Sequence, residues 1–275
     1  MNPRSGPPSP WRTRPAAARP VAGRPPEQRI HGVNACLAAF ARRRDALRKV
    51  YLDEARIPLF KEVLAWCVSR RVGYRVVGGA DLERLTGSRH HEGVCFDLLK
   101  PSPLPLDALL QRLPAPPSPS LLLWLDGVGN PHNLGALLRS AAHFGADAVL
   151  VPASSNLDVS GAAARVAEGA AEFVPLVHAA TAPDAWAALR GAGYRIAATV
   201  PREGASLYAT GLPARLVLVL GAEGEGMQPT MIADADLRLG IPGSGQVESL
   251  NVAASAAVLL GEWWRQNRSP PAPPA

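Results

Sequence analysis

Cysteine and aromatic residues are scarce in this chain of 275 residues, and long apolar runs are missing. The three cysteines, Cys36, Cys67 and Cys95, are odd in number and show no Cys-x-x-Cys spacing, and no histidines are paired at ligand spacing. This pattern argues against a disulfide framework and against a metal site. No apolar run reaches the roughly 18 residues that a membrane-spanning helix needs, so we expect no membrane segment.

The first 29 residues also lack the apolar segment of a secretory signal peptide. We therefore expect a cytoplasmic protein with reduced cysteines. Charge is unevenly distributed: residues 1–100 contain 19 Lys and Arg against 9 Asp and Glu, whereas residues 101–275 contain 10 against 14. The front of the chain thus has a formal charge of +10 and the rear −4, which predicts that the front contacts a polyanion such as nucleic acid.

Composition divides the chain into five segments. Residues 1–29 are rich in Pro, Arg, Gly and Ala, which predicts a disordered basic tail that either contacts RNA loosely or is inert. Seven prolines within residues 100–119 indicate an extended, semi-rigid linker. We therefore expect two α/β domains, over residues 30–99 and 120–267, followed by a disordered tail over residues 268–275.

Short apolar strands alternate with amphipathic helices in the first domain, which predicts a small α/β unit. His90 and His91 are adjacent and point in different directions, so they form a poor metal pair and a loop or RNA-contact role is favoured. The expected elements are a helix from Ile30 through about Phe40, a strand over 49–52, a helix over 58–71, a strand over 74–77, a helical turn over 81–85 and a closing strand.

A second alternation follows the linker. Six strands interleaved with helices over about 145 residues predict a mostly parallel sheet covered on both faces. The expected strands cover 121–125, 148–151, 173–177, 195–199, 216–220 and 237–241, and the expected helices cover 134–144, 159–169, 183–190 and the run from Ser249 to about Trp264.

The stretch with the most candidate site residues begins with five apolar residues, Leu216 to Leu220, which are followed by Gly221. This is typical of a buried strand that ends in a loop. Ligands of open α/β sheets bind at the carboxyl ends of the strands, so the loop from Gly221 to Met227 is a candidate ligand site. Its glycines let the backbone approach a ligand closely. Glu223 is the candidate side chain there, although a single loop acid is most often only solvated.

The following strand ends at Ile241, and Ser249 and Asn251 precede an apolar helical run. Ser249 is a suitable N-cap, so both polar residues could simply begin a helix.

The first strand of the second domain is followed by a polar loop in which Asn133 stands where a helix could be capped. Arg139 is harder to explain, because its neighbours Leu138 and Ala141 are apolar and a buried, unpaired guanidinium is costly. We expect a phosphate or carboxylate partner for it. Neither a Walker phosphate loop nor the dinucleotide Gly-x-Gly-x-x-Gly fingerprint fits the glycines of the chain.

Taken together, these stretches resemble the three ordered motifs of the SpoU (TrmH-like) RNA 2′-O-ribose methyltransferases of the SPOUT superfamily, over about residues 121–266. Residues 30–98 resemble the family's small, L30-type substrate-binding domain. The chain departs from the family pattern at Ala222, Gly243 and Glu92, where Asn, Met and Gln are frequent, and this leaves the RNA target open. The motifs are Asn133-Leu-Gly-(x)3-Arg139-(x)5-Gly145, Gly221-Ala-Glu223-Gly-Glu-Gly226 and Ile241-Pro-(x)6-Ser249-Leu-Asn251.

The resemblance implies an α/β trefoil-knotted domain with S-adenosylmethionine in the knot, a homodimer whose site is completed across the interface, and tRNA or rRNA as substrate. It implies that Arg139 acts on the ribose 2′-hydroxyl. Because a guanidinium is a poor base at neutral pH, we favour Arg139 as an organiser of the target phosphate and hydroxyl, while a role as general base stays open. By the same resemblance the other catalytic residues are Asn133, Glu223, Ser249 and Asn251, and the backbones of Gly221, Ile241 and Leu250 bind the cofactor.

Two other functions are compatible with parts of this pattern. One is a catalytically inactive RNA-binding protein that retains the fold, which a cofactor titration would distinguish. The other is a nucleotide-dependent enzyme of doubly wound architecture, against which the missing phosphate loops argue.

Overall fold

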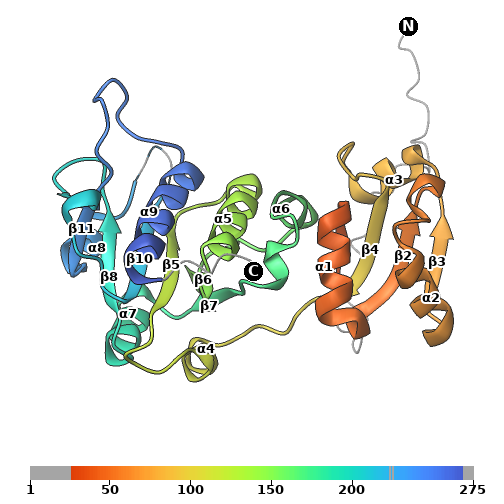
Figure 1. Cartoon of the computed structure of the whole chain (residues 1–275), viewed down its shortest axis with the longest axis horizontal. Coiled ribbons are helices and arrows are strands. Elements are labelled where there is room, and N and C mark those ends of the chain that lie inside the picture. The colour runs from red at the N-terminus through yellow and green to blue at the C-terminus, as the bar shows by residue number, and fades with distance from the viewer. Residues whose placement is uncertain (1–25, 223, 225, 269–275) are drawn as a thin grey trace, which may run out of the picture.

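The computed structural model describes residues 26–222, 224 and 226–268, which form two α/β domains joined by one linker (Figure 1). The predicted tails lie outside this part, except for residues 26–29 and Arg268. Within the described ranges, no helix combines the length and the apolarity that crossing a bilayer requires.

The N-terminal sheet is mixed and has four strands in the order β1-β4-β2-β3. Strand β4 pairs antiparallel with both β1 and β2, whereas β2 and β3 are parallel. Phe40, Phe60 and Phe96 are at the centre of its core. The elements are β1 (Glu27–His31), α1 (Val33–Arg43), β2 (Leu47–Leu52), α2 (Lys61–Arg70), β3 (Gly73–Val76), α3 (Gly79–Thr86) and β4 (Val94–Leu99).

The predicted helix from Ile30 is wrong at its start. Ile30 belongs to β1 and pairs with Phe96 of β4, so this strand begins inside the predicted basic tail. Gly32, at a φ of 99°, turns the chain, and α1 begins only at Val33, whose N–H donates to Glu92 Oε2 at 2.9 Å. A short apolar run suits either a helix or a strand, and here the pairing of Ile30 with Phe96, 66 residues later, decides.

The C-terminal sheet contains seven strands in the order β7-β6-β5-β10-β8-β11-β9, and neighbouring strands are parallel. The prediction of six strands missed β9, a two-residue strand at the edge. The predicted strand over 173–177 also lies too early, because a 3-10 turn occupies residues 170–172. The strands are β5 (Ser120–Asp126), β6 (Ala148–Pro152), β7 (Leu176–Ala179), β8 (Arg195–Thr199), β9 (Ala205–Ser206), β10 (Arg215–Gly221) and β11 (Leu237–Gly240).

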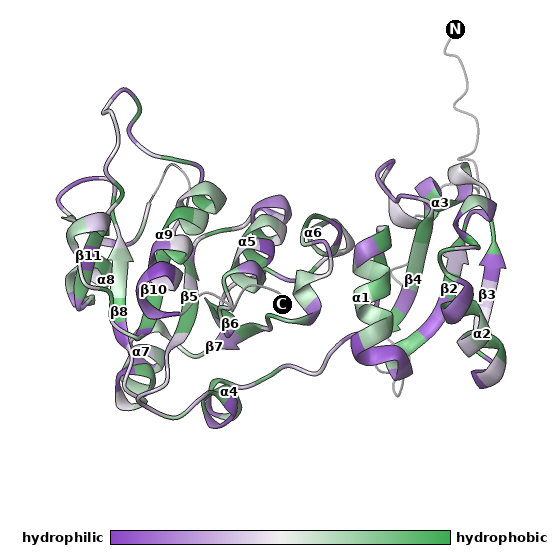
Figure 2. Ribbon diagram, viewed as in Figure 1, coloured by the Kyte–Doolittle hydropathy of each residue, from purple (hydrophilic) through white to green (hydrophobic). Residues whose placement is uncertain are grey.

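Helices cover both faces of this sheet, as the strand composition predicts. Successive side chains of a strand point to opposite faces, and β5 shows this directly: Leu121 and Leu123 belong to one core cluster, Leu122 and Trp124 to the other. Residues 121–125 at the centre of β5 are therefore all apolar (Figure 2). One cluster is formed with α5 (Pro131–His143), α6 (Gly161–Val166) and α9 (Val252–Asn267), and the other with α4 (Leu106–Arg112), α7 (Ala182–Gly191) and α8 (Pro229–Asp234).

Helix α4 interrupts the linker, which the sequence analysis expected to be extended throughout. It begins directly after Pro105 and ends before Pro114, so the prolines bound the helix and do not enter it. Leu109 of α4 is buried against the C-terminal sheet. The linker is thus partly folded onto that domain, near the bottom of Figure 1.

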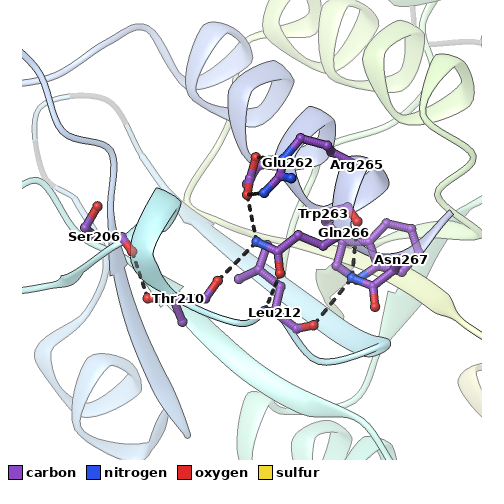
Figure 3. Close-up of polar contacts among 8 residues, drawn as sticks. All are labelled: Ser206, Thr210, Leu212, Glu262, Trp263, Arg265, Gln266 and Asn267. Carbon is purple, nitrogen blue, oxygen red and sulfur yellow. Dashed lines mark hydrogen bonds and ion pairs between the residues drawn. The ribbon is translucent and has the colours of Figure 1, made fainter. Parts of the chain in front are cut away.

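The end of α9 is tied to the segment before β10 by a polar network (Figure 3). Glu262 accepts hydrogen bonds from Arg265 at 2.7 and 2.8 Å and from Gln266 Nε2 at 2.7 Å. Gln266 in turn donates to Thr210 O at 3.1 Å and accepts from Leu212 N at 2.8 Å. These contacts fix the last helix on the sheet.

The two domains meet where α6 and the following 3-10 turn pack against α1 and β1. Ala164 of α6 is buried in the core of the N-terminal sheet. Asn34 Nδ2 donates to Glu168 Oε2 at 2.7 Å, and Gly169 lies so close to α1 that an added Cβ would be 2.7 Å from the Ala38 Cβ. The junction is therefore a packed interface with its own hydrogen bonds.

Candidate active site

The loop that leads to the first motif and the loop that contains the second motif follow neighbouring parallel strands. Strands β5 and β10 are paired so that Asp126 lies opposite Gly221, and both chains leave the sheet at the same edge. Gln228 N donates to Asp126 Oδ2 at 3.2 Å. A Cβ on Gly127 would be 3.1 Å from the Ala222 Cβ. The loops after β5 and β10 are thus in direct contact, as the strand-end argument predicts.

The loop after β10 folds back on itself. Gly226 N donates to Ala222 O at 3.0 Å, and a Cβ on Gly221 would be 2.6 Å from Met227 N. Only glycine fits at Gly221, because backbone atoms and not a flexible side chain fill the space. Gly224 and Gly226 have positive φ values of 87° and 74°. Glu223, the predicted acid of this loop, lies outside the described residues.

The third motif meets the first through two asparagines. Asn251 Nδ2 donates to Asn133 Oδ1 at 3.3 Å. Asn251 is also the N-cap of α9, since its Oδ1 accepts from Ala253 N at 2.9 Å and from Ala254 N at 3.4 Å. The prediction of Ser249 as the cap is therefore wrong. Ser249 lies in the exposed loop that precedes the helix.

The prediction that Asn133 caps a helix is also wrong. Asn130 is the N-cap of α5, and its Oδ1 accepts from His132 N at 2.9 Å. Pro131 occupies the first helical position, which favours an earlier helix start than the apolar pattern suggests. Asn133 therefore lies inside the first turn of α5, where its side chain is available to Asn251.

Arg139 is exposed, contrary to the expectation of a buried guanidinium. The buried face of α5 contains Leu134, Leu137, Leu138 and Ala141. Sequence neighbours one or two positions away do not share a helix face, so the apolar residues beside Arg139 say little about its burial. Within the described part of the chain Arg139 forms no hydrogen bond or ion pair, and its charge is open to a ligand.

The predicted cofactor residues lie along this same sheet edge. Ile241 follows β11 directly and is half-buried against the core. Strand β8 separates β11 from β10, so Gly221 and Ile241 are roughly 10 Å apart by strand spacing. Leu250 is 47% exposed and adjoins Asn251. The loop between β11 and α9 projects beyond the sheet in Figure 1, and residues 242–250 are exposed throughout.

These loops are suited to a small molecule that is held mainly by backbone groups. A Cβ at Gly129, Gly243 or Gly245 would meet nothing within 4 Å, so the backbone is open there. Residues 241–250 belong to no helix or strand, so their N–H and C=O groups are not engaged in regular structure. The described residues therefore fit a nucleoside-type ligand held at strand ends.

Sequence reasoning missed Asp126, which is only 8% exposed and receives the Gln228 amide that closes the second loop. Asp126 is the last residue of an apolar strand, and this position could have identified it as a candidate site residue from the sequence. The structure brings together the Asp126 and Gly221 strand ends, and separately Asn133 and Asn251. Arg139 is on α5 with Asn133 but forms no hydrogen bond or ion pair with Ser249 or Leu250 in the described part.

Comparisons with known proteins agree with this geometry. Residues 120–261 match the SpoU rRNA Methylase family, and residues 29–104 match the family described as RNA 2′-O ribose methyltransferase substrate binding. The chain is 40% identical over 243 residues to the uncharacterized tRNA/rRNA methyltransferase YfiF of Escherichia coli O157:H7, covering 88% of this chain and 69% of that protein. It is 34% identical to the 23S rRNA (guanosine-2′-O-)-methyltransferase RlmB of Pseudomonas putida, covering 88% of this chain and 97% of that one.

Solved structures share the architecture. An RNA 2′-O ribose methyltransferase superposes with a TM-score of 0.72 at 27% identity, covering 87% of this chain and 88% of that chain. An AdoMet-bound rRNA methyltransferase from Sinorhizobium meliloti has the same TM-score at 22% identity and 88% coverage of both, a likeness that concerns the fold alone. The family match covers more than half of the chain, and the resemblance expected from the three motifs is confirmed. This protein belongs to the SpoU rRNA Methylase family.

Proposed function

We propose that this protein transfers a methyl group from S-adenosylmethionine to a ribose 2′-hydroxyl of tRNA or rRNA. The observation that carries the proposal is the hydrogen bond between Asn133 and Asn251 at a sheet edge that also bears Gly221. It joins motifs that are 118 residues apart in the sequence, within a chain of the SpoU family.

The cofactor would lie against the loops after β10 and β11, where the backbones of Gly221, Ile241 and Leu250 can hold it. Bound there, S-adenosylmethionine supplies an electrophilic methyl group. The residues of the chain have a positioning task, because methyl transfer requires the acceptor oxygen to approach in line with the bond that breaks. Asn133, Ser249 and Asn251, with Glu223, would hold the acceptor and the cofactor in register.

Arg139 would bind the RNA phosphate next to the target ribose. Its exposed position on α5 suits this role, because a guanidinium forms paired hydrogen bonds with phosphate oxygens. In the transfer, the 2′-oxygen would gain the methyl group as the bond from that methyl to the sulfonium sulfur breaks, the cofactor would leave as a neutral thioether, and the hydroxyl would lose its proton. A guanidinium is a poor base at neutral pH, so Arg139 does not serve as the base in this scheme and the neighbouring substrate phosphate assists the proton's departure.

The trefoil knot and the homodimer belong to the same proposal. Strand β11 lies between β8 and β9, although β8 and β9 follow each other in the chain. Gly204 packs so tightly on this strand that a Cβ there would be 2.7 Å from Gly240 N. This threaded order supports a knot. Val247 and Leu250 are exposed apolar residues beside the proposed site, and a second copy of the chain would cover them. We also propose domain boundaries within residues 100–119.

Arg139→Ala tests the proposal. The matched control is Arg112→Ala, which removes an exposed arginine from α4, far from the strand ends in Figure 1. Each variant is incubated with labelled S-adenosylmethionine and total RNA from a strain that lacks the gene, and ribose methylation is mapped. Calorimetric titration measures cofactor affinity in parallel.

We expect Arg139→Ala to lose methyl transfer by at least a hundredfold, equivalent to about 2.7 kcal/mol of transition-state stabilisation, while it binds the cofactor almost normally. Arg112→Ala should match the wild type in both assays. Wild-type turnover by Arg139→Ala would refute the assigned role. A wild-type protein that binds RNA but neither the cofactor nor a methyl acceptor would instead indicate an inactive RNA-binding member of the family.

A further inference from the structure

A cavity of about 550 Å³ lies at the junction of the two domains, apart from the strand ends described above. Its walls come from β1, from the loop after α3, and from the starts of α5 and α6. This volume is within the range of pockets that hold small ligands. Eight of its residues have polar side chains, namely Arg29, His31, Thr86, Ser88, His90, His132, Ser160 and Arg165.

The charge of the cavity is one-sided. None of the described residues that line it is Asp or Glu, whereas two are arginines. Arg29 is already engaged, because its Nε and Nη2 donate to Asp97 at 2.6 and 3.1 Å. Arg165 is less committed: its Nη1 is 3.6 Å from Glu92 Oε1 and its side chain is 25% exposed. Arg165 is therefore the cation that a ligand in the cavity can reach.

His31 adds a second, independent observation. Its residue exposure is only 3%, and its Nε2 is buried with no hydrogen-bond partner among the described residues. Burial, together with the nearby charges of Arg165 and His91, lowers the pKa of His31. A buried imidazole nitrogen without a partner is unusual in a folded protein, and it marks the wall of this cavity as a place where a polar ligand would be stabilising.

The position of the cavity relates it to the proposed methyl-transfer site. His132 lines the cavity and directly precedes Asn133, whose side chain meets Asn251. The opposite wall is the N-terminal domain, which matches a substrate-binding family. The cavity is thus bordered both by the start of α5 and by the N-terminal domain, two parts of the chain that an RNA substrate would contact.

We propose that the junction cavity binds a phosphodiester group of the RNA strand, near the nucleotide that is methylated, through Arg165 and the histidines of its walls. The inference rests on the proposed function for the identity of the polymer. It adds an anchoring position outside the three family motifs. Phosphate contacts position a protein on a nucleic acid without reading its sequence, so this subsite would set the register of the strand.

The test introduces charge into the cavity from each wall. Ala162, in the first turn of α6, lines the cavity, and His90 lines it from the N-terminal domain. Ala162→Glu is compared with Ala162→Gln, and His90→Glu with His90→Gln, so that size is matched and only charge differs. An acid in the first turn of a helix is favourable, so Ala162→Glu should fold. Ala187→Glu, on the exposed side of α7, provides the same charge change elsewhere.

Filter binding with total bacterial ribosomal RNA measures affinity at several salt concentrations, and thermal melts check folding. We expect each Glu variant to bind about 5- to 10-fold more weakly than its Gln partner. The slope of log affinity against log salt concentration is negative, and we expect its magnitude to decrease by about 0.7 to 0.9, the value of one phosphate contact. Ala187→Glu should change affinity less than twofold.

Equal affinities within both Glu and Gln pairs would overturn the cavity's role, even if the wild type methylates RNA normally. Wild-type protein that transfers no methyl group, combined with a clear Glu effect on affinity, would instead refute the proposed function and leave the cavity as an RNA-binding site.

Discussion

Arg43 of α1 donates two hydrogen bonds to the carboxylate of Glu172, from Nε at 2.7 Å and from Nη2 at 2.9 Å, across the junction of the two domains. The two side chains are only 18% and 11% exposed. A bidentate pair in such surroundings is geometrically specific and little screened by solvent. It fixes the orientation of the N-terminal domain relative to the domain with the proposed active site.

Removing one partner of this pair should loosen the junction. We expect Arg43→Met to lower the free energy of unfolding by about 1–3 kcal/mol, because Glu172 is then left partly buried without its cation. Urea denaturation gives this value, and Arg48→Met, an exposed arginine of β2, is the control. The double variant Arg43→Met with Glu172→Met should recover part of the loss. A loss that is fully additive would mean that the pair is not coupled.

Asn251 has two separable tasks. Asn251→Ala removes the N-cap of α9 and should cost about 1 kcal/mol of stability, and it should also impair methyl transfer. Asn251→Asp keeps the capping oxygen for Ala253 and Ala254 but replaces the amide that donates to Asn133. We therefore expect Asn251→Asp to melt like the wild type and to stay deficient in methyl transfer. Full activity in Asn251→Asp would show that the Asn251 amide group is dispensable.

Glu262 should make the fold sensitive to acid. Hydrogen bonds from Arg265 and Gln266 lower the pKa of Glu262 to about 2, whereas an unfolded glutamate titrates near about 4.3. A carboxyl with a lower pKa in the folded state stabilises the fold above the unfolded pKa, and this contribution is lost as pH falls toward 2. Urea unfolding of the wild type and Glu262→Gln should differ by about 1 kcal/mol at pH 7 and converge toward pH 2. A difference independent of pH would contradict this.

Gly161 lies where the two domains approach each other closely. A Cβ there would be 2.8 Å from Arg29 O and 3.1 Å from His31 Nδ1. Alanine is otherwise preferred over glycine in a helix by about 1 kcal/mol. We nevertheless expect Gly161→Ala to be destabilising by about 1–3 kcal/mol, because backbone must move. Gly191→Ala in α7, where a Cβ meets nothing within 4 Å, should be neutral or stabilising. If both variants melt alike, the close approach is not maintained in solution.

The sequence by itself determined the α/β class and the positions of most strands. Runs such as Leu216 to Leu220 and Leu121 to Leu125 are bounded by polar residues or glycine and are typical of strands in a sheet that is buried on both faces. The three motifs were also readable, because their spacing is a local property of the chain. Glycines at strand ends and polar residues before helices require no knowledge of distant partners.

Tertiary structure decided what depended on partners far along the chain. Ile30 became a strand residue because Phe96 was available to pair with it. Arg139 proved exposed because the register of α5, set by Asn130 and Pro131, turns it away from the core. The meeting of Asn133 with Asn251, the insertion of β11 between β8 and β9, and the junction cavity all arise from packing between separated segments, for which no local pattern contains the information.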